Sequence, residues 1–141
     1  MFVLDDHDVV RRGLKELLED SGDIEVVGEA GTAVEARSGI PLAEPDVAVL
    51  DVRLSDGNGV EVCREIRLRH PEIKCVMFSA FDDEVTVIAS ILAGASGYEL
   101  KQIKGGDIVN AVRMVASGES LFEPALTGRV LDNGPEDEHG A

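Results

Sequence analysis

Residues 46–51 read DVAVLD, and this stretch decides the fold because an apolar run ends abruptly in a charged residue. Residues 47–50 form a continuous apolar run, which is typical of a strand covered on both faces of a parallel sheet. Asp51 ends this strand, and VRLSDGNG follows at 52–59. A carboxylate at the end of a buried strand is costly to leave without a partner. We therefore expect the chain to supply groups that compensate Asp51.

Short apolar segments alternate with amphipathic ones along the rest of the chain. We expect strands at 2–5, 24–30, 46–50, 74–80 and 97–101. We also expect five helices: the first starts at Asp8, the second spans Thr32–Ile40 before Pro41, and the third follows Asn58. The fourth carries the apolar stripe Val85, Ile88, Ile91 and Leu92, and the fifth stops near Gly118. Five strand–helix pairs in succession indicate an α/β parallel sheet with helices on both faces. Because crossovers are right-handed, the predicted fold is a flavodoxin-like, doubly wound five-stranded sheet of order 2-1-3-4-5.

Composition excludes several classes of protein. The chain has 141 residues, enough for one domain with a real core, and a formal net charge of −15. Such an acidic chain would be repelled by a phosphate backbone, so we expect no direct binding of nucleic acid. No apolar run approaches a membrane span, which favours a cytoplasmic protein without membrane contact. Cys63 and Cys75 lack metal-site spacing and are expected to be reduced core thiols.

Polar residues stand at the carboxyl ends of four predicted strands: Asp5 and Asp6, Asp51, Ser79 and Lys101. In a parallel sheet these ends lie together, and ligands bind beyond them. Carboxylates about 4 Å apart repel by roughly 4 kcal/mol at an effective dielectric near 20, unless a cation lies among them. A few oxygen ligands suit Mg²⁺. Because Lys101 adds an ammonium and Ser79 a hydroxyl, the set predicts phosphoryl transfer to Asp51.

Each of these residues also has an ordinary structural interpretation. Asp5 and Asp6 could cap a helix, and Asp51 could begin an Asx-turn into the following loop. Ser79 and Lys101 could simply end their strands. Their coincidence at one end of one sheet favours the functional interpretation.

Four stretches resemble the receiver domains of two-component response regulators. They are LDDHDVVRRGL at 4–14, PDVAVLDVRLSDGNGVEVCREIR at 45–67, FSA at 78–80 and GASGYELK at 94–101. The first and last are most similar to the class that carries a LuxR/NarL-type DNA-binding output domain. The resemblance covers about residues 1–120.

The resemblance implies a phosphoacceptor and a magnesium site. Asp51 would accept a phosphoryl group from a phosphohistidine of a partner sensor histidine kinase. Mg²⁺ would be bound by Asp6, Asp51 and the backbone carbonyl of Arg53. Asp5 would contribute through a bound water.

The resemblance also implies residues that respond to the phosphoryl group. Lys101 would pair with the phosphoryl oxygens, and Ser79 would donate its hydroxyl to them. Tyr98 takes the place of the family's switch aromatic, and Arg53 and Phe81 match positions that tune the lifetime of the phosphoryl group. The expected result is an altered surface on the fourth helix, fifth strand and fifth helix, with a homodimer forming on phosphorylation.

The implied function is a receiver domain over residues 1–118 that controls a transcriptional output domain. It would catalyse only its own phosphorylation and dephosphorylation and would not otherwise be an enzyme. Residues 119–141 read as a short helix and an acidic, partly disordered tail, with no DNA-binding domain. The chain is therefore expected to be an excised receiver or, alternatively, a stand-alone receiver acting through protein contacts.

Three rival functions are weighed against this one. A haloacid dehalogenase-type phosphohydrolase needs a second acid two residues after its nucleophile, where this chain has Arg53. A flavin carrier needs a phosphate cradle after the first strand, where DDHD would repel phosphate. A pseudo-receiver that is never phosphorylated would have no need for the complete set of Asp6, Asp51, Ser79 and Lys101.

Overall fold

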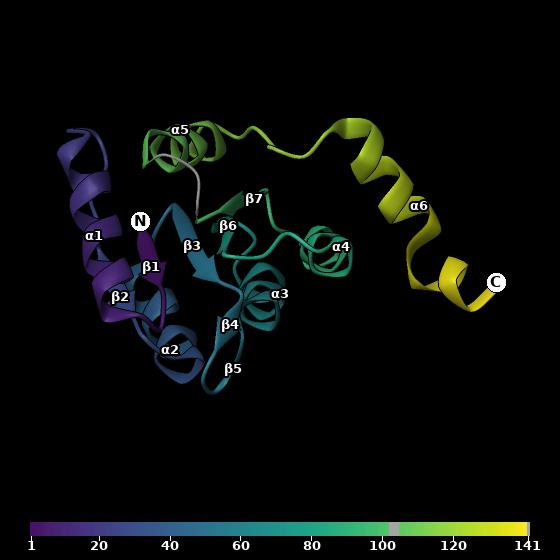
Figure 1. The fold of residues 1–141 in the computed structure, drawn as a ribbon, viewed down its shortest axis with the longest axis horizontal. Helices are drawn as coiled ribbons and strands as arrows, with labels where there is room; N and C mark the ends of the chain where they lie inside the picture. The colour runs from purple at the N-terminus through teal and green to yellow at the C-terminus, as the bar shows by residue number, and fades with distance from the viewer. Residues whose placement is uncertain (102–104, 141) are drawn as a thin grey trace.

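The computed structural model describes residues 1–101 and 105–140, with only the backbone described for residues 105, 106 and 133–140. Helices surround a central parallel sheet, and a further helix runs along one side of the molecule (Figure 1). The sheet strands are β1 (Phe2–Leu4), β2 (Gly28–Ala30), β3 (Val47–Asp51), β6 (Lys74–Ser79) and β7 (Gly97–Leu100), and β4 (Arg53–Leu54) and β5 (Gly57–Asn58) form a small hairpin. The helices are α1 (Asp8–Asp20), α2 (Ala33–Ala43), α3 (Gly59–Arg69), α4 (Glu84–Leu92), α5 (Gly105–Ala116) and α6 (Pro124–Gly140).

The strand order of the sheet is β2-β1-β3-β6-β7, and every neighbouring pair is parallel. This arrangement confirms the predicted order 2-1-3-4-5. In register, Val49 at the centre of β3 pairs with Val3 on one side and Val76 on the other. Since all strands run the same way, their carboxyl ends meet at one end of the sheet.

Helices cover both faces of the sheet, which explains the continuous apolar run of β3. Ala48 and Leu50 point into a core formed with α2, α3 and the end of α4. Val47 and Val49 point into a second core formed with α1 and α5. Because every residue of this strand meets a helix layer, none of its positions can be polar until Asp51.

Two predicted elements differ clearly from the structure in their bounds, and the other strands differ by at most one residue at an end. The strand expected at 24–30 is shortened to β2, because the ladder with its sole neighbour β1 begins with Phe2 opposite Gly28. The residues before Gly28 have only Met1 opposite them, which bonds to the backbone of Glu25 and Val27. The helix expected to stop before Pro41 continues to Ala43. A proline in the last turn removes only one helical hydrogen bond, and the helix ends soon afterwards at Glu44, whose φ is 49°.

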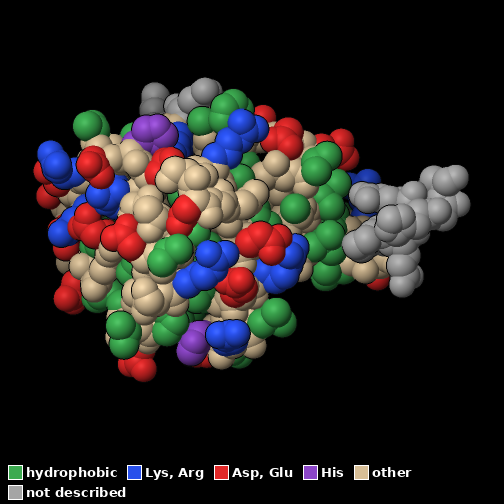
Figure 2. Space-filling model, turned by 90° about the horizontal axis from the view of Figure 1, so that it is seen from below, with side chains coloured by type: hydrophobic (Ala, Val, Ile, Leu, Met, Phe, Trp, Pro, Cys, Tyr) green, Lys and Arg blue, Asp and Glu red, His purple; other side chains and the backbone are tan. Residues whose placement is uncertain are grey.

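The segment after α5, where we expected a short helix and then an acidic, partly disordered tail, contains helix α6 over Pro124–Gly140. Leu121 and Phe122 pack against the two cores, and Val130 of α6 is buried. α6 lies beside α4, and hydrophobic side chains gather at this side of the molecule in Figure 2. Apolar burial therefore offsets the entropy of ordering this segment. The domain boundary near residue 118 stays a prediction.

Gly97→Ala is expected to loosen this C-terminal segment. A Cβ at position 97 would lie 2.5 Å from Leu121 Cδ1 and 3.1 Å from its Cγ, so Leu121 must move away from β7. We expect a loss of about 1 kcal/mol in the free energy of unfolding and faster proteolysis within 119–132. The matched control is Gly13→Ala, where a Cβ meets nothing within 4 Å. Equal cleavage rates in the two variants would contradict the docking of Leu121.

No helix within the described part of the chain is long and apolar enough to cross a membrane. On the face shown in Figure 2, acidic and basic side chains are intermingled, although acidic residues outnumber basic ones in the whole chain.

Candidate functional site

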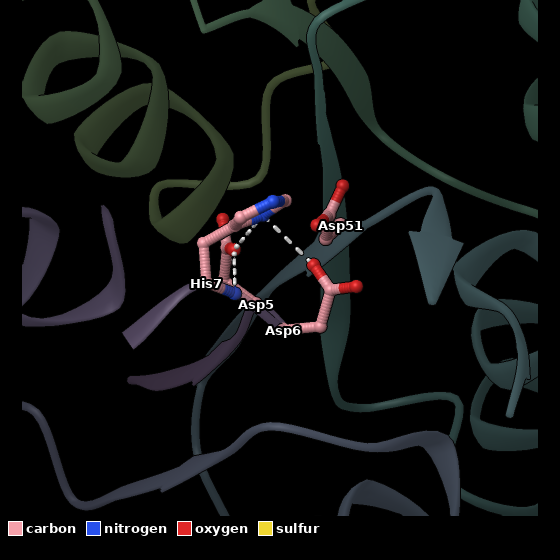
Figure 3. A group of neighbouring side chains, drawn as sticks. All are labelled: Asp5, Asp6, His7 and Asp51. Atoms are coloured by element: carbon pink, nitrogen blue, oxygen red, sulfur yellow. Dashed lines mark hydrogen bonds and ion pairs between the residues drawn. The ribbon is translucent and has the colours of Figure 1, made fainter. Parts of the chain in front are cut away.

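Four side chains meet at the carboxyl end of the sheet: Asp5, Asp6 and His7 after β1, and Asp51 at the end of β3 (Figure 3). One ligand atom from each lies within 4.8 Å of the others. Asp5 and Asp51 are buried, at 1 % and 4 % exposure. The carboxylates that the sequence placed at strand ends are therefore neighbours in space.

The register of the sheet explains this meeting. Leu4 of β1 lies opposite Leu50 of β3. The next residue on each strand is an aspartate, so Asp5 and Asp51 leave the sheet side by side. Two adjacent buried carboxylates require a positive partner.

Lys101 supplies that partner from the end of β7. Its Nζ lies 2.9 Å from Asp5 Oδ2 and 3.0 Å from Asp51 Oδ2. The Lys101 backbone N–H donates to the Ser79 carbonyl oxygen over 2.8 Å, which holds the end of β7 beside β6. Lys101 is thus one of the compensating groups that Asp51 requires.

The site still carries more negative than positive charge. Its three aspartates and one lysine leave an excess of two negative charges when all four are ionised and His7 is left out of the count. Asp5 Oδ2 and Asp6 Oδ1 are buried and accept no hydrogen bond. Each oxygen lies instead 2.9 Å from a nitrogen, Lys101 Nζ and His7 Nδ1 respectively. Hard carboxylate oxygens with this excess of negative charge fit a divalent cation such as Mg²⁺.

The remaining predicted residues lie around the ends of β6 and β7. Ser79 is buried, and its Oγ accepts a hydrogen bond of 3.1 Å from the Phe81 backbone N–H. The Tyr98 hydroxyl donates to the Phe81 carbonyl oxygen. The Arg53 guanidinium lies over the Phe81 ring, 4.0 Å from its centroid. Phe81 therefore links the ends of β6 and β7 to the hairpin that follows β3.

The hairpin carrying Arg53 is itself anchored. Asp56 in its turn accepts hydrogen bonds from the backbone N–H groups of Ala33 over 2.8 Å and Val34 over 3.1 Å. These donors are free at the start of α2, and the two bonds lower the pKa of Asp56. The anchor ties the hairpin that carries Arg53 to the start of α2.

Burial controls the electrostatics of the site. It raises the pKa of Asp51 to about 6, with the Asp5 charge adding to the rise and Lys101 opposing it. Burial also lowers the pKa of Lys101, but its contacts with Asp5 and Asp51 raise that pKa by more, and the net direction is upward. Burial raises the pKa of Tyr98, so its hydroxyl stays a neutral donor.

Asp51→Asn is expected to stabilise the protein in EDTA. The folded-state pKa of about 6 exceeds the ordinary value of 3.8, so between these values the folded state binds more protons and stability falls as pH rises. Removing this cost should raise the free energy of unfolding by about 1–3 kcal/mol at pH 7.5 and by little at pH 4. Urea unfolding beside Asp82→Asn, an exposed carboxylate, measures it. An unchanged free energy of unfolding at pH 7.5 would contradict a destabilising, buried Asp51 carboxylate.

Three residues that shape the site were not predicted from the sequence. Gly59 packs against the backbone of Asp51, Asp56 caps α2, and Arg11 bonds the backbone carbonyl of Asp5. Gly59 could have been noticed in the sequence. It is the first residue of α3 after the N-cap Asn58, and because glycine is a poor helix former, its presence there indicates a backbone that needs space. The contacts of Asp56 and Arg11 depend on the tertiary arrangement.

The model of the response regulator receiver domain family matches residues 1–113 of this chain. The chain belongs to that family. Receiver domains are signalling domains of two-component systems, so this receiver is a signalling domain as well.

Curated relatives match the receiver over 123 residues, or 87 % of its chain. It is 49 % identical to the DNA-binding transcriptional activator DevR/DosR of Mycobacterium tuberculosis and 38 % identical to the response regulator protein VraR of Staphylococcus aureus. The matched part is 57 % and 59 % of those two proteins, so the receiver spans less than three-fifths of their length.

Solved structures of response regulators also resemble this receiver. The receiver domain of the putative response regulator NarL from Mycobacterium tuberculosis has a TM-score of 0.80 at 35 % identity, covering 84 % of this chain and 95 % of that one. A LuxR-family two-component response regulator from Aurantimonas sp. SI85-9A1 has a TM-score of 0.82 at 28 % identity, covering 94 % of both chains. These matches confirm the resemblance to the LuxR/NarL-type class.

Proposed function

We propose that this receiver accepts a phosphoryl group on Asp51 in a Mg²⁺-dependent reaction and uses it to change its surface. The observation that carries the proposal is the placement of Lys101 Nζ within 3.0 Å of the buried Asp51 carboxylate, beside two further aspartates. A lysine that only neutralised Asp51 would not explain why Asp5 shares the same ammonium and why Asp6 lies in the same cluster.

The chemistry follows from the groups present. A carboxylate oxygen of Asp51 forms a bond to phosphorus while the bond from phosphorus to the imidazole nitrogen of a kinase phosphohistidine breaks, and the imidazole keeps the electron pair. A pKa of about 6 leaves most of Asp51 ionised and nucleophilic at neutral pH. Lys101 is already in place and exchanges its contact with Asp51 for one with the phosphoryl oxygens.

The cation would be held by Asp6, Asp51 and the backbone carbonyl of Arg53, with Asp5 acting through a water. When bound, it would neutralise the carboxylates and lower the repulsion of an incoming phosphoryl group. Asp6 suits this role because its buried Oδ1 accepts no hydrogen bond in the protein.

Ser79 and Tyr98 would report phosphorylation. The new group brings about −1.5 to −2 charges and three acceptor oxygens. The Ser79 hydroxyl can donate to one of them by turning away from the Phe81 N–H that it now accepts from. Tyr98, bonded to the Phe81 carbonyl and half-buried, would follow into the vacated space. This movement would change the surface of α4, β7 and α5, and the Arg53–Phe81 stack would govern how long the phosphoryl group survives.

The partners proposed are a sensor histidine kinase and, after phosphorylation, a second copy of this receiver. A relative described as a DNA-binding transcriptional activator supports a role in controlling a transcriptional output domain. The charge of −15 supports the absence of direct DNA binding by these residues. A stand-alone receiver acting through protein contacts is the alternative.

Intact-mass spectrometry after incubation with Mg²⁺ and acetyl phosphate tests the proposal. One phosphoryl group should add to the wild type, should be lost in hydroxylamine as acyl phosphates are, and should not add after chelation or in Asp51→Asn. No adduct on a folded wild-type protein would favour the pseudo-receiver instead.

A further inference from the structure

We infer that Arg11 is a positioning residue that orients the peptide unit between Asp5 and Asp6 for cation binding. The inference rests on the proposed function, in which Asp6 is a ligand of the cation. It adds a residue that touches neither the cation nor the phosphoryl group.

Arg11 lies in the first turns of α1 and points back to the end of β1. Its Nη1 donates to the backbone carbonyl oxygen of Asp5 over 2.6 Å. Its Nη2 donates to Asp8 Oδ1 over 2.6 Å, and its Nε donates to Glu29 Oε1 of β2 over 3.1 Å. The side chain is only 17 % exposed. One guanidinium thus joins β2, the start of α1 and the β1–α1 loop.

The bond to the Asp5 carbonyl matters because of what holds the two aspartates. The Asp5 side chain is held on both oxygens, by the His7 backbone N–H at 2.9 Å and by Lys101 Nζ at 2.9 Å. Asp6 Oδ1 accepts no hydrogen bond, and the His7 Nδ1 that faces it at 2.9 Å belongs to a side chain that is 69 % exposed. Apart from this exposed ring, the direction of the Asp6 side chain depends on the preceding peptide plane, whose carbonyl oxygen Arg11 holds.

The surroundings of Arg11 are shaped to receive it. A Cβ at Gly31 would lie 3.1 Å from Arg11 Nη1, so the glycine leaves room for the guanidinium. Glu29 is held from its other oxygen by Lys15 Nζ at 3.5 Å. Three acceptors on separate segments are reached together by the planar fork of arginine, and a lysine could reach only some of them.

Charge and positioning predict opposite effects for the loss of Arg11. Removing a cation near an acidic site strengthens binding of a divalent ion by electrostatics alone. If Arg11 orients Asp6, its removal weakens binding in spite of the added negative charge. Residues that orient metal ligands typically change affinity by about 10- to 100-fold.

The test is Mn²⁺ binding to the unphosphorylated protein, measured from the paramagnetic resonance signal of free Mn²⁺. We expect Arg11→Ala to weaken binding about 10-fold and Arg11→Lys about 3-fold or more. Arg12→Ala is the matched control, because Arg12 is the next residue of the same helix, has the same charge and is exposed. It should stay close to wild type.

Each outcome has a separate meaning. Arg11→Ala binding Mn²⁺ as tightly as Arg12→Ala, or more tightly, would overturn the inference while leaving the cation site intact. Should Arg11→Ala fail to fold, an Arg11→Lys affinity equal to wild type would overturn it equally. A wild-type protein that binds no Mn²⁺ would instead refute the cation site of the proposed function itself.

Discussion

Gly59→Ala is expected to destabilise this receiver by about 3 kcal/mol or more, because the added methyl group has nowhere to go. A Cβ at position 59 would lie 1.8 Å from the Asp51 carbonyl oxygen and 2.8 Å from its carbonyl carbon. Both are backbone atoms at the end of β3, so no side-chain rotation relieves the clash. In addition, the Gly59 N–H donates to the Val52 carbonyl oxygen over 2.7 Å, and movement would break this bond.

Gly57→Ala is the control for this prediction. Gly57 lies two residues earlier in the same turn region, and its Cβ would meet only Ala33 Cβ at an ordinary 3.6 Å. Urea unfolding should therefore show a change of less than about 1 kcal/mol for Gly57→Ala. If the two alanine variants were equally stable, the close packing of Gly59 on Asp51 would be wrong.

Lys101→Met is expected to cost about 3–5 kcal/mol at pH 8 in EDTA, the range for removing one partner of a buried ion pair. The variant leaves Asp5 and Asp51 charged, buried and unpaired. Without the ammonium, the pKa of Asp51 should rise further above 6, so protonation relieves the cost as pH falls below that value. Mg²⁺ should restore part of the stability by occupying the same acidic site.

Thermal and urea unfolding at pH 5 and pH 8, with and without Mg²⁺, measure this effect. Lys74→Met is the control, since Lys74 begins β6 at the opposite end of the sheet from the aspartates. A Lys101→Met loss that is the same at both pH values and unaffected by Mg²⁺ would contradict the pairing of Lys101 with ionised carboxylates.

Much of the fold and the core of the site could be predicted from the sequence. Alternation of short apolar runs with amphipathic segments set the parallel sheet, since few windings satisfy right-handed crossovers. Once β1 and β3 were neighbours, the aspartates that follow Leu4 and Leu50 had to meet. The cluster of Asp5, Asp6 and Asp51 therefore needed only topology.

The rest could not be predicted because it depends on tertiary distances. The closeness of Gly59 to the Asp51 carbonyl arises from the hairpin of β4 and β5, whose strands are only two residues each. The role proposed for Arg11 depends on its guanidinium reaching both the Asp5 carbonyl oxygen and Glu29, and strand order alone does not set these distances. A short helix was expected after residue 118, but the burial of Val130 in α6 depends on where this helix packs. The pattern of apolar and polar residues in the sequence does not predict these distances.

The most direct test of the central proposal is to locate the phosphoryl group on the chain. Borohydride reduces the acyl phosphate of an aspartate to homoserine, which survives digestion and can be placed by peptide sequencing in a mass spectrometer. After treatment with Mg²⁺ and acetyl phosphate, we expect homoserine at position 51 and none when Mg²⁺ is chelated. Homoserine at Asp5 or Asp6, or an unchanged yield in Asp51→Asn, would contradict the assignment of Asp51 as the phosphoacceptor.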